Sequence, residues 1–229
     1  MDNAKRGGKP LKLGEKLMLK ISIGILSASI FLAACANPAD NKAKAVTAEA
    51  NSTAATTRQI KGESVAITPD NSKVEFVGSK VTGKHDGGFK QFSGNIDLVS
   101  DKPEASQVAI DIDMNSVFTD ADGLTKHLQT GDFFEVEKHP KSSFVSTKIV
   151  SDAAKGADNF TITGDLEMRG QKKSVTFPAK IAVNPNEVAV NAEFAINRKD
   201  FGIVYAGKAD DLIRDEVVIK LDLKSRRNK

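Results

Sequence analysis

The stretch "FTITGDLEMRG", residues 160–170, decides the fold, because its side chains change character at every second position. The residues between the apolar positions are Thr, Asp, Glu and Arg, and the apolar series itself is Phe160, Ile162, Gly164, Leu166 and Met168. A period of two is typical of a strand with one buried face and one wet face. Arg169 and Gly170 then mark a tight turn. The stretch therefore predicts a half-buried antiparallel strand that enters a hairpin.

The same alternation recurs along most of the chain. It is present in "KVEFVG" (73–78), "VAIDIDMNSV" (108–117), "SVTFPAKIAV" (174–183), "EVAVNAEFAI" (187–196) and "EVVIKLDLKS" (216–225). Turn signals such as "NPNE" (184–187) separate these segments, and little helix is expected between them. About eight antiparallel strands in succession predict an all-β barrel or sandwich.

Phenylalanine dominates the apolar faces of these strands, whereas the chain has no tryptophan and one tyrosine. The phenylalanines on expected strands are Phe76, Phe144, Phe160, Phe177 and Phe194. An eight-stranded barrel is just wide enough to be filled by side chains or to hold one elongated ligand. Alternation alone leaves both interiors open, a packed core and an apolar tunnel.

One segment, "TKHLQTGDFFEVEKHP" (125–140), does not alternate. Leu124 and Leu128 have the i, i+4 spacing of a helix, and Asp120 or Asp122 is suited to cap its start. Gly131 is suited to end it. We expect a short helix across one mouth of the barrel.

The segment continues with two adjacent aromatic residues, Phe133 and Phe134. In a turn that covers a barrel mouth, we expect one ring to point into the interior and the other toward the rim.

Basic residues are concentrated at the N-terminus. Residues 1–34 hold six of the 33 Lys and Arg but two of the 30 acids, so the formal charge of +3 belongs to this segment. The remainder is close to neutral, which argues against a nucleic-acid partner. The following run "ISIGILSASIFLAA" (21–34) is too short to span a bilayer as a helix and predicts a secretory signal peptide over residues 1–34.

The ending "LAAC" resembles the lipobox of bacterial lipoproteins. That resemblance implies cleavage before Cys35 and acylation of its sulfur and amine, which together anchor the chain in a membrane. Cys35 is the only cysteine, so no intramolecular disulfide forms. Ala36 follows it instead of aspartate, which by the same resemblance implies an outer-membrane lipoprotein that faces the periplasm.

The next segment is rich in Ala, Thr, Asn and Ser. With few bulky apolar residues it predicts a disordered tether over residues 35–63, followed by one folded domain over 64–229.

Several motifs of that domain occur in the order typical of one family. "KVEFVGSKVTGKHDGGFKQFSGNIDL" (73–98) contains a Phe-x-x-Phe-x-Gly pattern, and "KHLQTGDFFEVEKHPKSSF" (126–144) contains His-Leu, Asp-Phe-Phe and a later Pro. "ITGDLEMRGQKKSVTFPA" (162–179) and "INRKDFGI" (196–203) complete the series. The chain thus resembles the YceI-like family of bacterial extracytoplasmic proteins. It departs from many relatives at Glu167 and Ser174.

The resemblance implies an eight-stranded, lipocalin-like barrel that binds a polyisoprenoid lipid, free or on a quinone-like or phosphorylated head, without a cofactor. It leaves a homodimer open. The expected lipid-binding residues are Phe76, Phe92, Leu124, Leu128, Phe133, Phe134, Phe144, Phe160, Phe177 and Phe194.

Catalytic readings have little support in the residue pattern. The chain has three histidines and neither an HxH nor an HExxH motif, so no metal site is expected. His127 and Asp132 are suited to act as base and orienter, yet no Gly-x-Ser-x-Gly nucleophile turn accompanies them. We expect His127 to anchor the helix through a loop backbone and Asp132 to cap its turn.

Two alternatives to non-catalytic lipid binding remain. One is an enzyme that acts on an isoprenoid lipid through His127. The other is a structural or stress-related envelope protein whose barrel interior is filled by side chains. A basic group at the 169–173 hairpin, Arg169, Lys172 and Lys173, is expected to be a solvated turn, with a phosphate or membrane-surface contact as the alternative.

Overall fold

The computed structural model describes residues 36–50 and 62–227, which belong to one compact unit spanning residues 34–229. The expected signal peptide (1–34) and the expected lipidation site, Cys35, lie outside the described residues.

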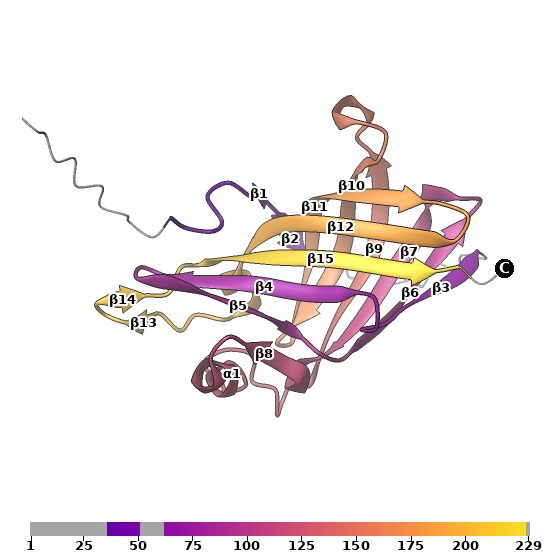
Figure 1. The fold of residues 1–229 in the computed structure, drawn as a ribbon. Helices are drawn as coiled ribbons and strands as arrows, with labels where there is room; N and C mark the ends of the chain where they lie inside the picture. The colour runs from indigo at the N-terminus through magenta and orange to yellow at the C-terminus, as the bar shows by residue number, and fades with distance from the viewer. Residues whose placement is uncertain (1–35, 51–61, 228–229) are drawn as a thin grey trace, which may run out of the picture. The chain divides into compact units, whose positions relative to one another are not determined.

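Strands account for most of the described chain (Figure 1). They are β1 (Ala43–Lys44), β2 (Val46–Glu49), β3 (Glu63–Ile67), β4 (Lys73–Lys80), β5 (Gly83–Phe89), β6 (Phe92–Val99), β7 (Lys102–Asp113), β8 (Val117–Thr119), β9 (Lys141–Ser151), β10 (Asn159–Met168), β11 (Gln171–Val183), β12 (Glu187–Asn197), β13 (Gly207–Lys208), β14 (Asp211–Leu212) and β15 (Glu216–Arg226). The helices are α1 (Asp122–Leu128) and the 3-10 turns η1 (Met114–Ser116), η2 (Ala153–Lys155) and η3 (Arg198–Phe201).

One curled sheet contains all these strands except β13 and β14, which form a hairpin of their own (Figure 1). Its main path runs β3-β6-β7-β9-β10-β11-β12-β15-β4-β5-β8, and every pairing along that path is antiparallel. The predicted all-β class and antiparallel pairing are confirmed, and the sheet curls as a lipocalin-like fold requires, although the expected count of eight strands is not reproduced.

Two bends allow the sheet to curl. β5 and β6 are separated only by Lys90 and Gln91, and β7 and β8 only by η1. Across the bend, the Lys90 amide donates to the Ser116 carbonyl at 3.1 Å and the Asp113 amide donates to the Gln91 carbonyl at 3.0 Å. One bent ribbon therefore pairs with β3 at one end and with β4 at the other. The bends also explain why the structure has more, shorter strands than the alternation suggested.

Two hairpins have the two-residue loops that suit the twist of a sheet. Ser100 and Asp101 connect β6 to β7, and Arg169 and Gly170 connect β10 to β11, all with φ between 50° and 69°. Positive φ at both loop positions is the signature of a type I′ turn. The turn expected after residue 168 is therefore confirmed.

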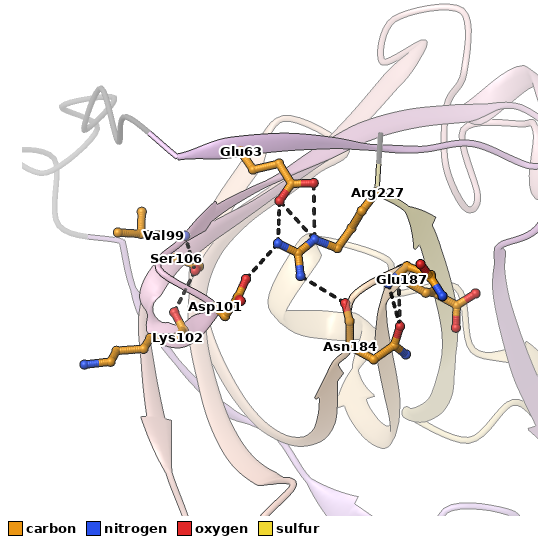
Figure 2. A network of polar contacts seen from close by, with 9 residues as sticks. Glu63, Val99, Asp101, Lys102, Ser106, Asn184, Glu187 and Arg227 are labelled. Carbon is orange, nitrogen blue, oxygen red and sulfur yellow. Dashed lines mark hydrogen bonds and ion pairs between the residues drawn. The ribbon is translucent and has the colours of Figure 1, made fainter. Parts of the chain in front are cut away.

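Arg227 joins the start of β3 and two hairpin loops at the end of the sheet where β15 finishes (Figure 2). Its guanidinium donates to Glu63 at 2.6 and 2.9 Å, to Asp101 at 2.8 Å and to the Asn184 carbonyl at 2.9 Å. The hydrogen bonds that Arg227 donates to Glu63, followed by the charge of Asp101, raise the pKa of Arg227 above its ordinary value. These contacts fix the start of β3 and two hairpin loops to one another.

The sheet forks between β11 and β12. These two strands pair only between Lys180–Val183 and Val188–Asn191, after which they separate. Residues 43–49, named here the N-terminal strap, lie in this fork: β1 pairs with β12 and β2 pairs with β11.

The strap corrects part of the predicted tether over residues 35–63. Its strands, β1 and β2, are ordered because the fork offers two open strand edges whose backbone groups need partners. The Ala45 amide, for example, donates to the Ala195 carbonyl at 2.8 Å. The part of the expected tether from 51 to 61 lies outside the described residues.

Candidate functional site

Two adjacent cavities occupy the space enclosed by the curled sheet. The larger has a volume of 310 Å³ and lies toward α1, and the smaller has a volume of 110 Å³ and lies deeper between the strands. They share five lining residues: Phe76, Phe89, Met168, Ile196 and Ile219. The shared wall makes the two cavities neighbours, and together they are named here the tunnel.

The tunnel lining is almost wholly apolar. Phe76 sits where the two parts meet and packs against Phe89 with ring centroids 5.9 Å apart. Deeper in, Phe144 contacts Phe177 at 5.7 Å, and Phe177 stacks on Phe194 at 4.1 Å. Such a surface offers contact area and almost no hydrogen bonding. These cavities argue against the alternative of a barrel whose interior is filled by side chains.

Eight of the ten predicted site residues line the tunnel. Those of the larger part are Phe76, Leu124, Leu128, Phe133 and Phe134, and those of the smaller part are Phe76, Phe144, Phe177 and Phe194. Phe92 and Phe160 are buried, at 7% and 6% exposure, in the core beside the tunnel and line neither part. Lipid binding by the eight residues remains a prediction.

Most of the aliphatic residues that line the tunnel were not predicted as site residues from the sequence. Examples are Met168, Ile196, Ile203, Ile213 and Ile219. Met168, Ile196 and Ile219 lie on predicted strands, so alternation placed them on apolar faces without telling which depth of the interior they reach. Ile203 and Ile213 lie outside the long strands, where no periodic signal exists.

Helix α1 covers one end of the tunnel, as expected, but its termini differ from the prediction. Ala121 is the residue at its N-cap and makes no side-chain hydrogen bond. Asp120 instead accepts a hydrogen bond from the Asp86 amide at 3.3 Å and pairs with His85 Nδ1 at 2.8 Å. The helix ends at Leu128, three residues before Gly131. Leu128 is buried and reaches the tunnel.

Phe133 and Phe134 follow α1 and both line the larger part of the tunnel. Phe133 is 7% exposed, and Phe134 is half-buried against Phe89 at 6.1 Å. The Phe134 amide donates to the Leu128 carbonyl at 3.0 Å, which ties this segment back to the helix.

His127 binds a side chain instead of the predicted loop backbone. Its Nε2 lies 2.8 Å from Asp132 Oδ2, and its ring makes edge contacts with Phe133 and Tyr205 at 5.0 and 5.2 Å. Asp132 is therefore the partner of His127, and the expectation that it only caps its own turn was wrong. Within residues 36–50 and 62–227, no serine, threonine or tyrosine hydroxyl is hydrogen bonded to the His127 ring.

Arg169 holds the three loops around the α1 end together. Its guanidinium donates to the Gly202 carbonyl and, at 2.6 Å, to the Gly131 carbonyl, and it lies 3.7 Å from Glu135. Hydrogen bonding by Lys138, with further attraction from Arg169, lowers the pKa of Glu135 below its ordinary value.

The other two members of the basic group also have intramolecular partners. Lys172 pairs with Asp165 at 3.6 Å, and Lys173 pairs with Glu49 of the N-terminal strap at 2.5 Å. The 169–173 hairpin is thus more than a solvated turn, since its charges hold neighbouring segments.

Arg198 fixes the loop that borders the tunnel mouth. This side chain is 4% exposed and donates to the carbonyls of Arg214, Ile203 and Ile213 at 3.0, 2.7 and 3.4 Å. It also reaches Asp215 at 3.3 Å. Burial lowers the pKa of Arg198 from its ordinary value, and the charge of Asp215 opposes that shift.

In the described part of the chain, no cluster of three or more His, Cys, Asp and Glu side chains is placed to hold a metal ion. None of the helices described is long and apolar enough to cross a membrane.

A curled antiparallel sheet around an apolar tunnel, with a short helix at the mouth, defines a lipocalin-like class of proteins that enclose a small ligand. The chain belongs to the YceI-like family, because the model of the YceI-like domain matches residues 66–225.

Relatives of known sequence agree with this assignment. A UPF0312 protein of Pseudomonas putida (strain GB-1) is 35% identical over 140 residues, which cover 58% of this chain and 71% of that protein. A UPF0312 protein of Pseudomonas fluorescens (strain SBW25) is 33% identical over 133 residues, 56% of this chain and 68% of that protein.

Solved structures show the same fold. BcnA of Burkholderia cenocepacia superposes with a TM-score of 0.61 at 25% identity and covers 69% of this chain and 98% of its own. A polyisoprenoid binding domain from Saccharophagus degradans, implicated in plant cell wall breakdown, superposes with a TM-score of 0.58 at 17% identity and covers 73% and 100%.

Proposed function

We propose that this chain is a non-catalytic binding protein that holds the tail of a polyisoprenoid lipid in its tunnel. The observation that carries the proposal is the pair of adjacent apolar cavities, of 310 and 110 Å³. Their combined size lies within the range of small-molecule sites in proteins. The name of the Saccharophagus degradans domain, a polyisoprenoid binding domain on the same fold, supports the ligand class.

The chemistry of the lining favours a hydrocarbon tail over a polar ligand. Burial of apolar surface contributes about 25 cal/mol per Å², whereas each buried polar group without a partner costs free energy. The exposed surface of the walls around Phe76, Phe177 and Phe194 is almost wholly apolar, so such groups would find few partners. A long branched chain without hydrogen-bonding groups is the ligand that gives up the fewest hydrogen bonds to water when it enters the tunnel.

The proposal places the protein in the cell envelope as a lipoprotein. The signal-like residues 1–34 and the lipobox-like ending at Cys35 support acylation at that cysteine and an outer-membrane anchor that leaves the barrel in the periplasm. A quinone-like or phosphorylated head group would remain at the mouth, outside the apolar part of the tunnel.

The test is to express the full chain in a Gram-negative host, extract it with mild detergent and identify bound lipid by mass spectrometry. A blocking variant is Gly78→Leu, because Gly78 lines the larger cavity and a Cβ there would meet no atom within 4 Å. The matched control is Gly123→Leu, since Gly123 is exposed on α1 and also has open space around its Cβ.

We expect isoprenoid lipid with the parent chain and with Gly123→Leu, and a large loss with Gly78→Leu at unchanged stability. A parent protein that neither retains nor takes up an isoprenoid contradicts the proposal. Equal lipid content in both variants would show that the lipid binds outside the tunnel.

A second candidate, an enzyme acting on an isoprenoid lipid, is favoured by the 2.8 Å contact between His127 and Asp132 at the mouth. The variant His127→Gln keeps a polar side chain but removes the base. Unchanged lipid composition and full function of this variant in cells would eliminate the catalytic reading, whereas accumulation of an unreacted isoprenoid would support it.

A further inference from the structure

Three exposed apolar side chains meet beside the tunnel mouth. They come from separate segments: Val81 from the β4–β5 turn, Val204 from the loop after η3, and Leu212 from β14. Their exposures are 52%, 64% and 48%. The Val81 amide donates to the Leu212 carbonyl at 3.1 Å, and all three residues line one surface groove of 550 Å³. These three residues are named here the outer rim.

The grouping is unusual for this surface. Six large apolar residues are exposed in the described chain, and three of them belong to the outer rim. Singly scattered apolar side chains on a surface are ordinary, whereas a cluster beside a ligand site marks a contact surface. The outer rim is therefore suited to contact a partner that has an apolar interior.

The beginning of the described chain indicates which partner this is. Asn37 lines the same groove as the outer rim, and it lies two residues after Cys35. Two residues of chain extend at most about 7 Å. A membrane that holds acyl chains on Cys35 therefore lies within reach of this groove.

The N-terminal segment is also fixed to the sheet at this point. Ala39 is 1% exposed and packs in a small cluster with Val77, Ala195 and Val218. Lys42 pairs with Glu193 at 2.8 Å, two strands away from the β4–β5 turn. Because no long tether separates Cys35 from the sheet, the anchor would set the orientation of the barrel.

The groove continues into the tunnel. Arg198, Ile213 and Arg214 line both the groove and the larger cavity. The two acids that line the groove are paired, since Arg198 pairs with Asp215 and Lys44 with Glu216. Arg214 makes no ion pair in the part of the chain that the structure describes, so the groove keeps a cation suited to a lipid phosphate.

We propose that the outer rim docks on the phospholipid bilayer that holds the N-terminal anchor, with Val81, Val204 and Leu212 among the lipid head groups and upper acyl chains. In this position the tunnel mouth faces the membrane, and an isoprenoid tail passes between the bilayer and the tunnel without crossing water. The inference rests on the lipoprotein part of the proposed function and adds to it the contacting surface.

The test uses the absence of tryptophan from the chain. Val204→Trp and Leu212→Trp each introduce a single fluorophore on the outer rim, and Val150→Trp introduces one on β9, where the parent side chain is 42% exposed and outside the groove. The acylated full-length proteins are reconstituted into vesicles of phosphatidylethanolamine and phosphatidylglycerol, with and without bromine on the acyl chains.

We expect the emission of Val204→Trp and Leu212→Trp to shift to shorter wavelength and to lose most of its intensity with brominated lipid. Emission from Val150→Trp is expected to stay unchanged. Equal responses at positions 204 and 150, in proteins that float with the vesicles, would overturn the docking surface.

The same samples separate this inference from the proposed function. Proteins that fail to float with vesicles would refute both the anchor and the docking surface. Normal quenching together with no isoprenoid uptake would refute the tunnel function while it supports the docking surface.

Discussion

Phe177 and Phe194 stack face to face, with ring centroids 4.1 Å apart and planes inclined by 11°, across the fork where their strands have separated. The register of β11 and β12, continued from Lys180 and Asn191, would place these two residues opposite each other. The two strands therefore stay in contact through these side chains beyond the point where their backbone hydrogen bonds end. The rings close the fork from the tunnel side, while the N-terminal strap satisfies its open edges.

The stacked pair predicts an energetic coupling. Phe177→Leu and Phe194→Leu should each destabilise the fold by roughly 1–3 kcal/mol, through lost contacts in the core. The double variant should reveal a coupling of about 0.5–1.5 kcal/mol, measured by urea unfolding. As a control, Phe118→Leu combined with Phe177→Leu should be additive, because Phe118 lies on β8, where its ring contacts Lys90. Full additivity of the Phe177 and Phe194 variants would mean that the stacking contributes nothing.

The N-terminal strap predicts a local effect of proline. Ala45→Pro removes the amide that donates to the Ala195 carbonyl, so the strap should leave the fork. Hydrogen exchange should then accelerate in Lys173–Thr176 of β11, which pairs with β2, while β10 stays protected. Ala50→Pro, just beyond β2, is the control and should leave exchange unchanged. Unaltered exchange in both variants would show that the strap does not protect the fork.

The N-terminal strap was not predicted, because its sequence lacks the pattern that identified the long strands. Strands β10 to β12 were predictable because a period of two records directly which face is buried. The strap consists of small and polar residues, and its pairing comes from backbone groups that the fork leaves open, which no side-chain pattern records. Strand formation at an edge depends more on its neighbours than on its own composition.

The direction of the site side chains could be predicted from the sequence, but the shape of the cavity could not. Phe144 and Phe177 were placed in the interior by alternation and do line the tunnel, whereas Phe160 faces the same interior and is enclosed by core side chains. Alternation gives the direction of a side chain but not the space beyond its tip. The partner of His127 depended on how the chain turns back after α1, which local spacing does not determine.

Arg169 predicts a link between the tunnel mouth and the hairpin at residues 168–171. Arg169→Met keeps much of the side-chain volume but removes the donors to the Gly202 and Gly131 carbonyls. We expect a loss of about 1–3 kcal/mol, since two hydrogen bonds from a charged donor are removed, one of them to the partly buried Gly202 carbonyl. Faster hydrogen exchange should appear in residues 130–136. Lys126→Met, on the exposed side of α1, should change stability by less than about 0.5 kcal/mol. If both variants change stability by a similarly small amount, Arg169 does not hold the three loops together.

Asp120 predicts a pH dependence at the junction of β5 and α1. The hydrogen bond from His85, followed by that from the Asp86 amide, lowers the pKa of Asp120 below its ordinary value. A carboxyl whose folded pKa is depressed contributes stability above its unfolded pKa of about 3.9, and that contribution is lost as the pH falls through the folded pKa. The melting temperature of Asp120→Asn should therefore differ from that of the parent at pH 7 and converge with it under acid conditions.

Asp70→Asn is the control for this pH series. Asp70 is exposed, and the described part of the chain shows no hydrogen bond or ion pair of its side chain. Its variant should follow the parent at every pH. Parallel melting curves for Asp120→Asn and Asp70→Asn would show that the contact with His85 carries no pH-dependent stability.

Gly164 predicts how closely the tunnel wall is packed. A Cβ at this position would overlap the ring of Phe144 and would lie 2.7 Å from the Val145 carbonyl oxygen, so the ring can rest on β10 only if the residue is glycine. Gly164→Ala should therefore cost about 1–3 kcal/mol, by overpacking. Gly123→Ala, in α1 with open space around its Cβ, should instead gain about 0.4–1 kcal/mol. Thermal unfolding of the two alanine variants, which add the same methyl group, separates wall packing from backbone entropy. A stable Gly164→Ala protein would mean that Phe144 can move into the tunnel, and its lipid capacity should then fall.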